Sequence, residues 1–234
     1  MVTIMTTDAD ALYRLMSWLS PGFPVGAFSY SHGIEYAVEA GLVRDEESLH
    51  DWIDAGLAHE FGPVNGAMLR AAYEAARRSD RTALAEALED ARALVPTLEF
   101  ELEHRAQGQA FIMAFRAAWH DDEANGDLAR ILDTDWVPYP CAVGIAAGYC
   151  AIALEQALVA FFHSVASNLV SAGLRLVPLG QTSGQRIIAS LQPAVIAAAR
   201  AVLRRDPADV GAAAPVIEWT SIAHETQYTR LFRS

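Results

Sequence analysis

Two His-Glu pairs are the stretches of this chain that come closest to a zinc-binding motif. In a zinc-binding helix the second histidine lies four residues after the first, so that both imidazoles project from one face. Pro63 occupies that position after His59, and Tyr228 occupies it after His224. Neither pair therefore predicts a zinc site.

A third candidate is His104, which follows three carboxylates of the same expected helix, those of Glu99, Glu101 and Glu103. Carboxylates beside an imidazole can attract a divalent cation, but a solvated helix face is the alternative, and we favour it. His163 lies in the apolar stretch FFHSVASN. We expect it to be a core histidine satisfied by a hydrogen bond rather than a metal ligand.

Other catalytic chemistries find little support in the sequence. The stretches GFS and HSV supply no nucleophile elbow. GQTSG lacks the lysine of a phosphate-binding loop, and the 17 basic residues of the chain are all arginine. Because arginine stays protonated, Schiff-base and pyridoxal chemistry are excluded. We therefore expect no catalytic residue, no cofactor and no resident metal, and a protein that is not an enzyme.

Two alternatives stay open beside a non-enzymatic binding protein. One is a metal-dependent hydrolase that uses His59, His104 or His163 with nearby acids. The other is a helical protein that binds a small apolar molecule between its helices.

The net charge of the chain is −12, and it is unevenly spread. Twelve carboxylates and four arginines lie between Glu86 and Asp135, whereas residues 219–234 hold one acid and two arginines. A nucleic-acid partner needs a basic stripe, so we expect none. We interpret the acidic stretch as a solvated face, with a docking surface for a basic partner as the alternative.

Cysteine usage and hydropathy favour a soluble, cytoplasmic protein. Cys141 and Cys150 are the only cysteines, and on one helix they would stand about 13 Å apart, too far for a disulfide. No basic region followed by an apolar run marks a secretory signal. Polar residues interrupt the apolar run at 141–154 before it could span a bilayer, so we expect no membrane partner; they are Glu155, Gln156 and His163.

The spacing of apolar residues is helical nearly everywhere, and no alternating strand pattern is convincing. We expect an all-α, single-domain multi-helix bundle over residues 1–205, followed over 206–234 by a linker and a flexible C-terminal tail that docks on a partner. The expected helices cover residues 8–19, 28–40, 45–61, 64–79, 82–95, 97–119, 141–172 and 181–203.

The stretch 141–172 is apolar almost all round, which is typical of a central buried helix. Gly144 and Gly148 on it would let a neighbouring helix approach closely. Asp45 is expected to cap the helix that follows it. Pro193 is expected to kink or divide the last helix of the bundle.

The C-terminal tail combines apolar anchors at helical spacing with neighbouring arginines. These residues are Trp219, Ile222, Tyr228, Arg230, Leu231, Phe232 and Arg233. Such a segment behind a linker can fold back onto its own bundle or dock on a partner. The residues alone favour neither outcome.

The stretch SPGFPVGAFSYSHGIE, residues 20–35, carries apolar side chains among its glycines and prolines. In one interpretation it is a tight turn whose Phe23, Val25 and Phe28 plug the end of the bundle. In the other, the rigid turn presents Tyr30 and Glu35 on a surface that another protein contacts. Both interpretations can hold together.

Three stretches in this order resemble one known family. They are LSPGFPVGAFSYSHGIE, NLVSAGLRLVPLGQTSGQRI and the ending HETQYTRLFRS. Together they are similar to the F-type urease accessory protein (UreF) family, from about Leu12 to the last residue given.

The resemblance implies an all-helical protein that forms a homodimer and helps to install nickel in apo-urease. It implies a non-enzymatic adaptor that bridges the UreD/UreH scaffold and the UreG GTPase and modulates GTP-dependent nickel delivery. It also implies that the C-terminal segment becomes ordered on the UreD/UreH partner, which favours docking for the tail.

The resemblance places partner-binding residues in three groups. The first group is Gly22, Phe23, Pro24, Gly26, Phe28, Tyr30, Ser31, Gly33 and Glu35. The second is Arg175, Pro178, Leu179, Gly180 and Gln181. The third is Tyr228, Arg230, Leu231, Phe232 and Arg233. Many family members have lysine where this chain has Arg175, so a role that needs positive charge is kept and one that needs a deprotonatable amine is not.

Overall fold

The computed structural model describes residues 8–119 and 136–234 and shows α-helices with no β-strand among these residues. Two short non-α turns, the 3-10 turn η1 (Ala27–Ser29) and the π-helical turn η2 (Phe61–Asn65), join α-helices. The α-helices are α1 (Asp8–Trp18), α2 (Ile34–Glu39), α3 (Glu46–His59), α4 (Gly66–Arg78), α5 (Arg81–Ala93), α6 (Leu98–Ala118), α8 (Tyr139–Tyr149), α9 (Leu154–Leu176), α10 (Gln181–Ser190), α11 (Gln192–Arg204) and α12 (Pro215–His224). The expected all-α bundle is confirmed.

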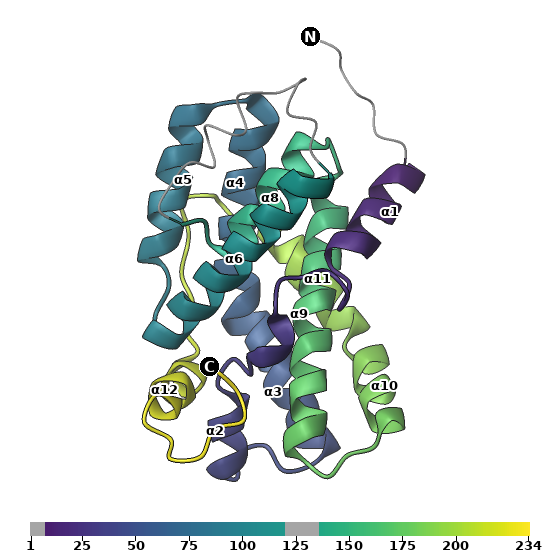
Figure 1. The fold of residues 1–234 in the computed structure, drawn as a ribbon, viewed down its shortest axis with the longest axis vertical. Coiled ribbons are helices and arrows are strands. Elements are labelled where there is room, and N and C mark those ends of the chain that lie inside the picture. The colour runs from purple at the N-terminus through teal and green to yellow at the C-terminus, as the bar shows by residue number, and fades with distance from the viewer. Residues whose placement is uncertain (1–7, 120–135) are drawn as a thin grey trace.

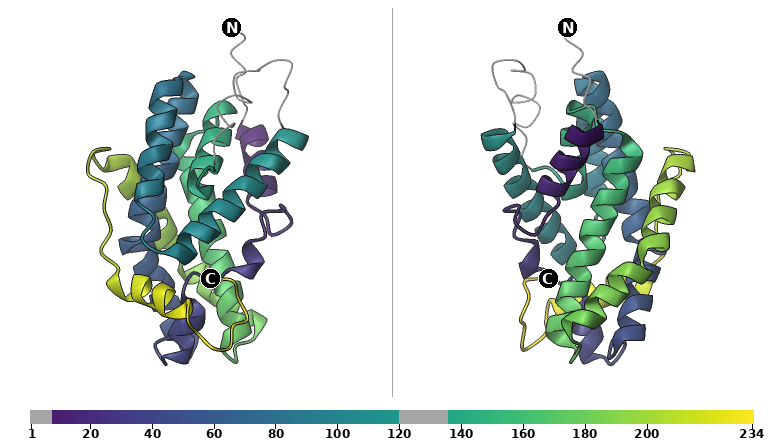
Figure 2. Two further views of the ribbon diagram at one scale, coloured as in Figure 1. Left: turned by 60° about the vertical axis from the view of Figure 1, so that its left-hand side comes forward. Right: turned by 90° about the vertical axis from the view of Figure 1, so that its right-hand side faces the viewer.

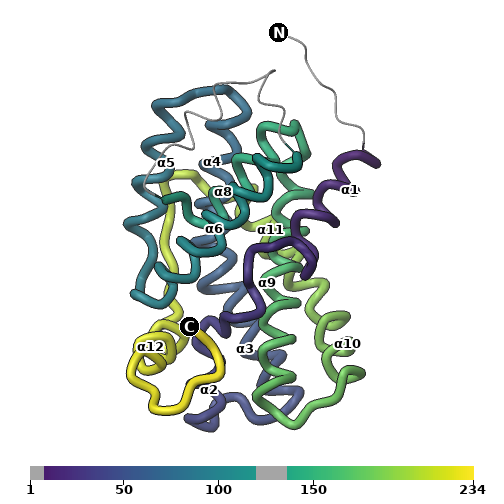
Figure 3. Tube along the Cα trace, in the orientation of Figure 1, coloured from purple at the N-terminus to yellow at the C-terminus, as the bar shows by residue number. Residues whose placement is uncertain are grey.

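α9 runs along much of the long axis of the molecule, and α2, α3, α8 and α11 pack against it (Figure 1). At one end α4 pairs with α5 and packs against α8, and at the other end α12 packs against α2. α10 and α11 lie on the side of α9 opposite to α6 (Figure 2, right). The Cα trace leaves α11 through an extended linker, passes through α12 and makes a wide loop that ends near α2 (Figure 3).

Close helix packing at the centre depends on two glycines of α8. A Cβ at Gly144 would lie 2.3 Å from the carbonyl oxygen of Leu69, and one at Gly148 would lie 2.5 Å from that of Tyr73. Both carbonyls belong to α4, so the two backbones approach more closely than any side chain allows. The expected role of the two glycines is confirmed.

The expected single helix over 141–172 is wrong, because the chain turns between α8 and α9. Ala151 adopts a left-handed conformation with φ 55°, and the Tyr73 hydroxyl donates a 2.7 Å hydrogen bond to the carbonyl oxygen of Ile152. Both helices contribute apolar residues to the core, so the apolar pattern runs across the turn without a break. Cys141 and Cys150 are both buried and free.

The expected helix over 28–40 is also shorter than predicted, since α2 begins only at Ile34. His32 and Gly33 precede it with φ of 54° and 81°. A Cβ at Gly33 would lie 2.8 Å from the Thr220 hydroxyl of α12, so glycine here lets α12 lie against α2.

Local capping explains several other boundaries. The Asp45 carboxylate accepts a hydrogen bond from the Ser48 amide and closes a capping box at the start of α3, as expected. Pro193 divides the last predicted helix into α10 and α11, which are bent by 40°.

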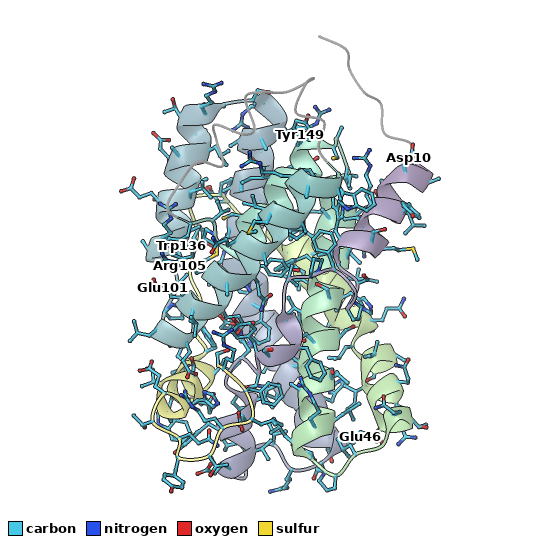
Figure 4. The ribbon with its side chains drawn as sticks, viewed as in Figure 1. Asp10, Glu46, Glu101, Arg105, Trp136 and Tyr149 are labelled. Atoms are coloured by element: carbon cyan, nitrogen blue, oxygen red, sulfur yellow. The ribbon has the colours of Figure 1, made fainter. Side chains whose placement is uncertain are left out.

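Arg186 of α10 holds Glu46 of α3 through two hydrogen bonds of 2.9 and 2.7 Å (Figure 4 labels Glu46).

The linker between α11 and α12 is fastened at both ends. The Arg70 guanidinium of α4 donates 2.9 Å hydrogen bonds to the carbonyl oxygens of Val202 and Arg205. The Ala213 amide donates a 3.1 Å bond to the carbonyl oxygen of His59. α12 therefore starts from a defined position on the bundle.

α9 is long and apolar enough to cross a membrane by length and composition alone. It packs against several helices of the bundle, α2, α3, α8 and α11, so it has the character of a core helix. No clear membrane span follows.

A leucine at position 148 should destabilise the fold by overpacking. We expect Gly148→Leu to lower the free energy of unfolding by about 3 kcal/mol or to prevent folding, because the α4 backbone cannot move aside. Urea denaturation followed by circular dichroism measures this. Gly211→Leu is the control, since no atom lies within 4 Å of a Cβ there. Equal stability of the two variants would contradict the packing argument.

A candidate docking site around Arg175

Arg175 lies between two phenylalanine rings that come from distant parts of the chain. Its guanidinium carbon is 3.6 Å from the centre of the Phe28 ring and 4.2 Å from that of Phe232. Its Nη1 donates a 2.8 Å hydrogen bond to the carbonyl oxygen of Phe28. A cation is attracted to the face of an aromatic ring, and a planar guanidinium stacks well on such a face. The three sequence motifs therefore meet at one side chain.

The surroundings of Arg175 are only partly polar. Its Nη2 is buried and has no hydrogen-bond partner among the described residues. Burial lowers the pKa of Arg175 from its ordinary value, although a guanidinium stays charged at neutral pH. The site thus holds one positive charge against two ring faces.

The other predicted residues of the second motif lie beyond Arg175 at the start of α10. Pro178, Gly180 and Gln181 are exposed, and Leu179 is half-buried against the core. They form an exposed turn next to the arginine.

The first motif divides into an outer and an inner part. Gly22, Pro24, Gly26 and Phe28 are exposed, so Phe28 does not plug the bundle. Phe23 does pack inward, with its ring centre 5.2 Å from that of Phe111. Val25, Tyr30, Ser31, Gly33 and Glu35 are buried. The expectation that Tyr30 and Glu35 are presented at the surface is therefore wrong for this conformation of the chain.

The inner part of the first motif binds the C-terminal segment, defined here as residues 225–234. The Glu35 carboxylate accepts hydrogen bonds from the amides of Leu231 and Phe232, at 2.6 and 2.9 Å. The Ser31 amide and hydroxyl both donate to the main-chain oxygen of Ser234, at 2.7 and 2.6 Å. The segment is folded back onto the bundle, which is one of the two outcomes left open by the sequence.

A buried histidine joins two buried carboxylates beneath this segment. His224 has no exposed surface; its Nδ1 is 2.7 Å from an oxygen of Glu99, and its Nε2 is 3.0 Å from an oxygen of Glu35. Arg230 of the C-terminal segment also donates to Glu99, at 3.1 Å. Burial alone lowers the pKa of His224, but the hydrogen bonds to Glu99 and Glu35 outweigh it and raise the pKa above 6.5.

A second cluster of the same kind lies nearby. His32 is 3.2 Å from a Glu103 oxygen and 3.4 Å from a Glu60 oxygen, and its ring stacks on Phe100 with centres 3.9 Å apart. Burial alone lowers the pKa of His32, but Glu103 and Glu60 outweigh it and raise the pKa to about 10. The Ser234 hydroxyl donates a 3.0 Å bond to Glu103, so this cluster also contacts the C-terminal segment.

The positions of the histidines contradict two interpretations made from the sequence. The carboxylate-rich start of α6 is not a solvated face, because Glu99 and His104 are buried and Glu103 nearly so. Burial lowers the pKa of His104 to about 4, which keeps it neutral at pH 7. His163 is not a core histidine, since it is exposed on α9, where its Nε2 lies 3.4 Å from the Ser167 hydroxyl.

The C-terminal segment keeps several large side chains in solvent while it is folded back. Tyr228 is fully exposed and Leu231 is 64% exposed, whereas Phe232 is buried. The arginines Arg230 and Arg233 are also exposed, and the Arg233 guanidinium carbon lies 5.9 Å from the centre of the Tyr30 ring. Folding back therefore leaves apolar and cationic groups available to another molecule.

α12 adds a second exposed apolar row beside this segment. Val216, Trp219 and Ile222 are each about half exposed, while the Trp219 ring makes an edge contact with Tyr36 at 5.3 Å. α12 is anchored beneath by a 2.7 Å hydrogen bond between the hydroxyls of Thr97 and Ser221.

The two alternative functions meet different findings. Among the described residues no group of three or more His, Cys, Asp or Glu side chains could hold a metal ion. A groove of about 600 Å³ lies between α3, α4, α5, α11 and the linker, and its lining combines alanines with acidic and arginine side chains. None of the three motifs contributes to that groove.

The fold and the site define an all-helical protein in which three separate motifs build one surface around an arginine. The sequence profile of the UreF family matches residues 43–192. A protein of Rhodopseudomonas palustris (strain HaA2) named "Urease accessory protein UreF" is 50% identical over 226 residues, which cover 96% of this chain and 94% of that protein. One of Bradyrhizobium diazoefficiens with the same name is 47% identical over 227 residues, covering 97% and 93%. The chain belongs to the UreF family.

Stability should depend on pH through His32. The unfolded chain loses this proton near pH 6.5, whereas the folded chain keeps it up to about pH 10, so the stabilisation is complete below 6.5 and is lost as the pH rises. The free energy of unfolding should fall by about 1.4 kcal/mol per pH unit in this window for such a group. Urea denaturation between pH 7 and 9 measures the slope.

His32→Gln should remove that share of the slope and lower stability at pH 6 by about 3 kcal/mol, because two carboxylates lose their buried partner. His163→Gln, at an exposed position on α9, serves as the control. Below pH 4.5 the free energy of unfolding should depend on pH with the opposite sign. Burial raises the pKa of the Glu103 carboxyl, but His32 outweighs burial and lowers this pKa. The stabilisation by ionised Glu103 is therefore lost as the pH falls. An unchanged slope in His32→Gln would assign the alkaline loss to another group.

Proposed function

We propose that this protein is a urease accessory protein required for the insertion of nickel into apo-urease. In this role it is a cytoplasmic, non-enzymatic adaptor that bridges the UreD/UreH scaffold and the UreG GTPase and modulates the GTP-dependent delivery of nickel. It acts as a homodimer. Membership of the UreF family supports the maturation role, and the names of its relatives carry the word urease.

The convergence of three motifs on Arg175 is the observation that carries the adaptor role. Phe28, Arg175 and Phe232 lie far apart in the sequence, yet both rings stack on the Arg175 guanidinium. Phe28 is exposed, and so are Arg230 and Arg233 on either side of Phe232 in the sequence. Packing of the core does not account for side chains that lie in solvent. Aromatic and arginine side chains dominate the energetics of protein interfaces.

The two proposed parts of the chain then have different tasks. Residues 1–205 form the bundle that carries Arg175, and residues 206–234 form the linker and the tail that docks on a partner. The tail exposes large apolar side chains, notably Trp219, Tyr228 and Leu231, which suits a contact with the UreD/UreH scaffold. The arginine-rich surface suits an acidic surface of the GTPase.

Exposed tail side chains should be needed for the scaffold contact. We expect Tyr228→Ala combined with Leu231→Ala to weaken co-purification with UreD/UreH, with an affinity loss of about tenfold or more. Met113→Ala, an exposed apolar change on α6, is the control. These point changes are cleaner than deleting residues 219–234, which also removes His224 from two buried carboxylates. Wild-type binding by the double variant would remove the tail from this interface.

Arg175 gives a test of the GTPase contact. Arg175→Glu should impair recruitment of UreG and urease activation by about tenfold or more while circular dichroism stays unchanged, since the charge is reversed at the centre of the site. Arg175→Lys keeps the charge and should retain most activity. Arg116→Glu reverses an exposed charge elsewhere and should have no effect. Normal activation by Arg175→Glu would reduce Arg175 to a packing role.

A further inference from the structure

We propose that His224 is a protonation-operated latch, which holds the C-terminal segment on the bundle while its imidazole is charged and releases the segment when it loses one proton. The proposal concerns the conformation of this chain alone. It therefore holds or fails independently of which partners the chain has.

The geometry around His224 requires a charged ring. Both ring nitrogens face carboxylate oxygens, Nδ1 that of Glu99 at 2.7 Å and Nε2 that of Glu35 at 3.0 Å. A carboxylate can only accept, and a neutral imidazole has one N–H. Only the imidazolium can donate to both partners at once.

The same two carboxylates hold the C-terminal segment. Glu35 accepts the amides of Leu231 and Phe232, and Glu99 accepts a guanidinium N–H from Arg230. The segment and the imidazolium thus share two acceptors. Each of them depends on those carboxylates being ionised and correctly placed.

When the ring loses one proton, one of its two nitrogens no longer carries a hydrogen. The carboxylate that faces this nitrogen then loses its hydrogen bond. Glu35 and Glu99 are 6% and 5% exposed, so water cannot replace the lost partner while the segment is in place. A buried charge without a full set of partners is strongly unfavourable. Movement of residues 225–234 away from the bundle is the change that admits water to both carboxylates.

The charged groups that face His224 come from each element around it. Glu35 belongs to α2, Glu99 to α6 and Arg230 to the C-terminal segment, and no other charged side chain among the described residues is within ion-pair distance of the ring. Histidine is the side chain whose ordinary pKa lies close to neutral pH. The cluster around His32 lies at the far end of the segment and touches it through Ser234 alone.

Release would uncover one half of the Arg175 site. Phe232 leaves with the segment, and Phe28 stays with the bundle. The latch therefore controls whether the three motifs form one surface or two separate ones.

Hydrogen exchange of the full-length chain tests the latch. The protection of the Leu231 and Phe232 amides is measured by mass spectrometry from pH 5.5 to 9 and corrected for intrinsic exchange. We expect constant protection below pH 6.5 and, from there up to the raised pKa of His224 in the closed latch, a loss that approaches tenfold per pH unit, because closing the latch takes up one proton. The amides of α9 report global unfolding, which also depends on pH through His32, so they should keep a pH dependence in His224→Gln where the Leu231 and Phe232 amides lose theirs.

Three variants separate the latch from a merely structural contact. His224→Gln should lower the protection of the segment and abolish its pH dependence. Arg230→Gln should lower the protection but keep the tenfold slope, since the imidazolium is intact. His163→Gln should match the wild type in both respects. If His224→Gln does not fold, NMR titration of the wild-type His224 ring replaces it, and its midpoint should coincide with that of the Leu231 and Phe232 amide signals.

Three results would overturn the proposal. They are protection that is independent of pH in the wild type, a slope at Leu231 and Phe232 that survives in His224→Gln, and protection of these two amides that equals that of the α9 amides at every pH, which would mean that the segment opens only when the whole chain unfolds. In the NMR experiment, a His224 midpoint distinct from that of the two amides would overturn it as well.

Discussion

Two carboxylates buried at the junction of α2, α6 and α12 constrain this end of the molecule. Glu35 and Glu99 cannot be left without partners in a site closed to water. His224 supplies positive charge to both, and the amides and Arg230 of the C-terminal segment complete the set. The position of α12 and the path of the last ten residues both follow from this requirement. A core of hydrocarbon side chains would hold the helices together but would not determine the path of residues 225–234.

The surface around Arg175 depends on the same arrangement. Phe232 stacks on the guanidinium while Glu35 binds its amide and that of Leu231 and Ser31 binds Ser234. Residues at three places in the sequence thus become one surface through a buried charge network rather than through their own contacts. This separates the residues that touch a partner in the proposed complex from those that position them, and it moves Glu35 from the first group to the second.

The sequence predicted the helices well where local signals mark their ends. The capping box at Asp45 and the division at Pro193 both follow from nearest-neighbour chemistry. The turn between α8 and α9 was missed, because two buried helices in succession give an unbroken apolar run. The charge clusters were missed for another reason: Glu99 and His224 are distant in sequence, and a carboxylate on a helix gives no sign of whether its face is wet or buried. His224 was considered only as part of a zinc motif, which Tyr228 excludes, and a His-Glu pair carries no information about a carboxylate 125 residues away.

The fastened linker sets the reach of whatever the tail captures. Arg70 and the Ala213 amide tie the linker to the bundle, and the hydroxyl pair of Thr97 and Ser221 holds α12 in place. Ten residues beyond α12 extend at most about 35 Å. A molecule that binds at the far end of these residues therefore stays within this distance of α12, at an effective concentration in the millimolar range. Within that distance even a weak second contact would be occupied most of the time.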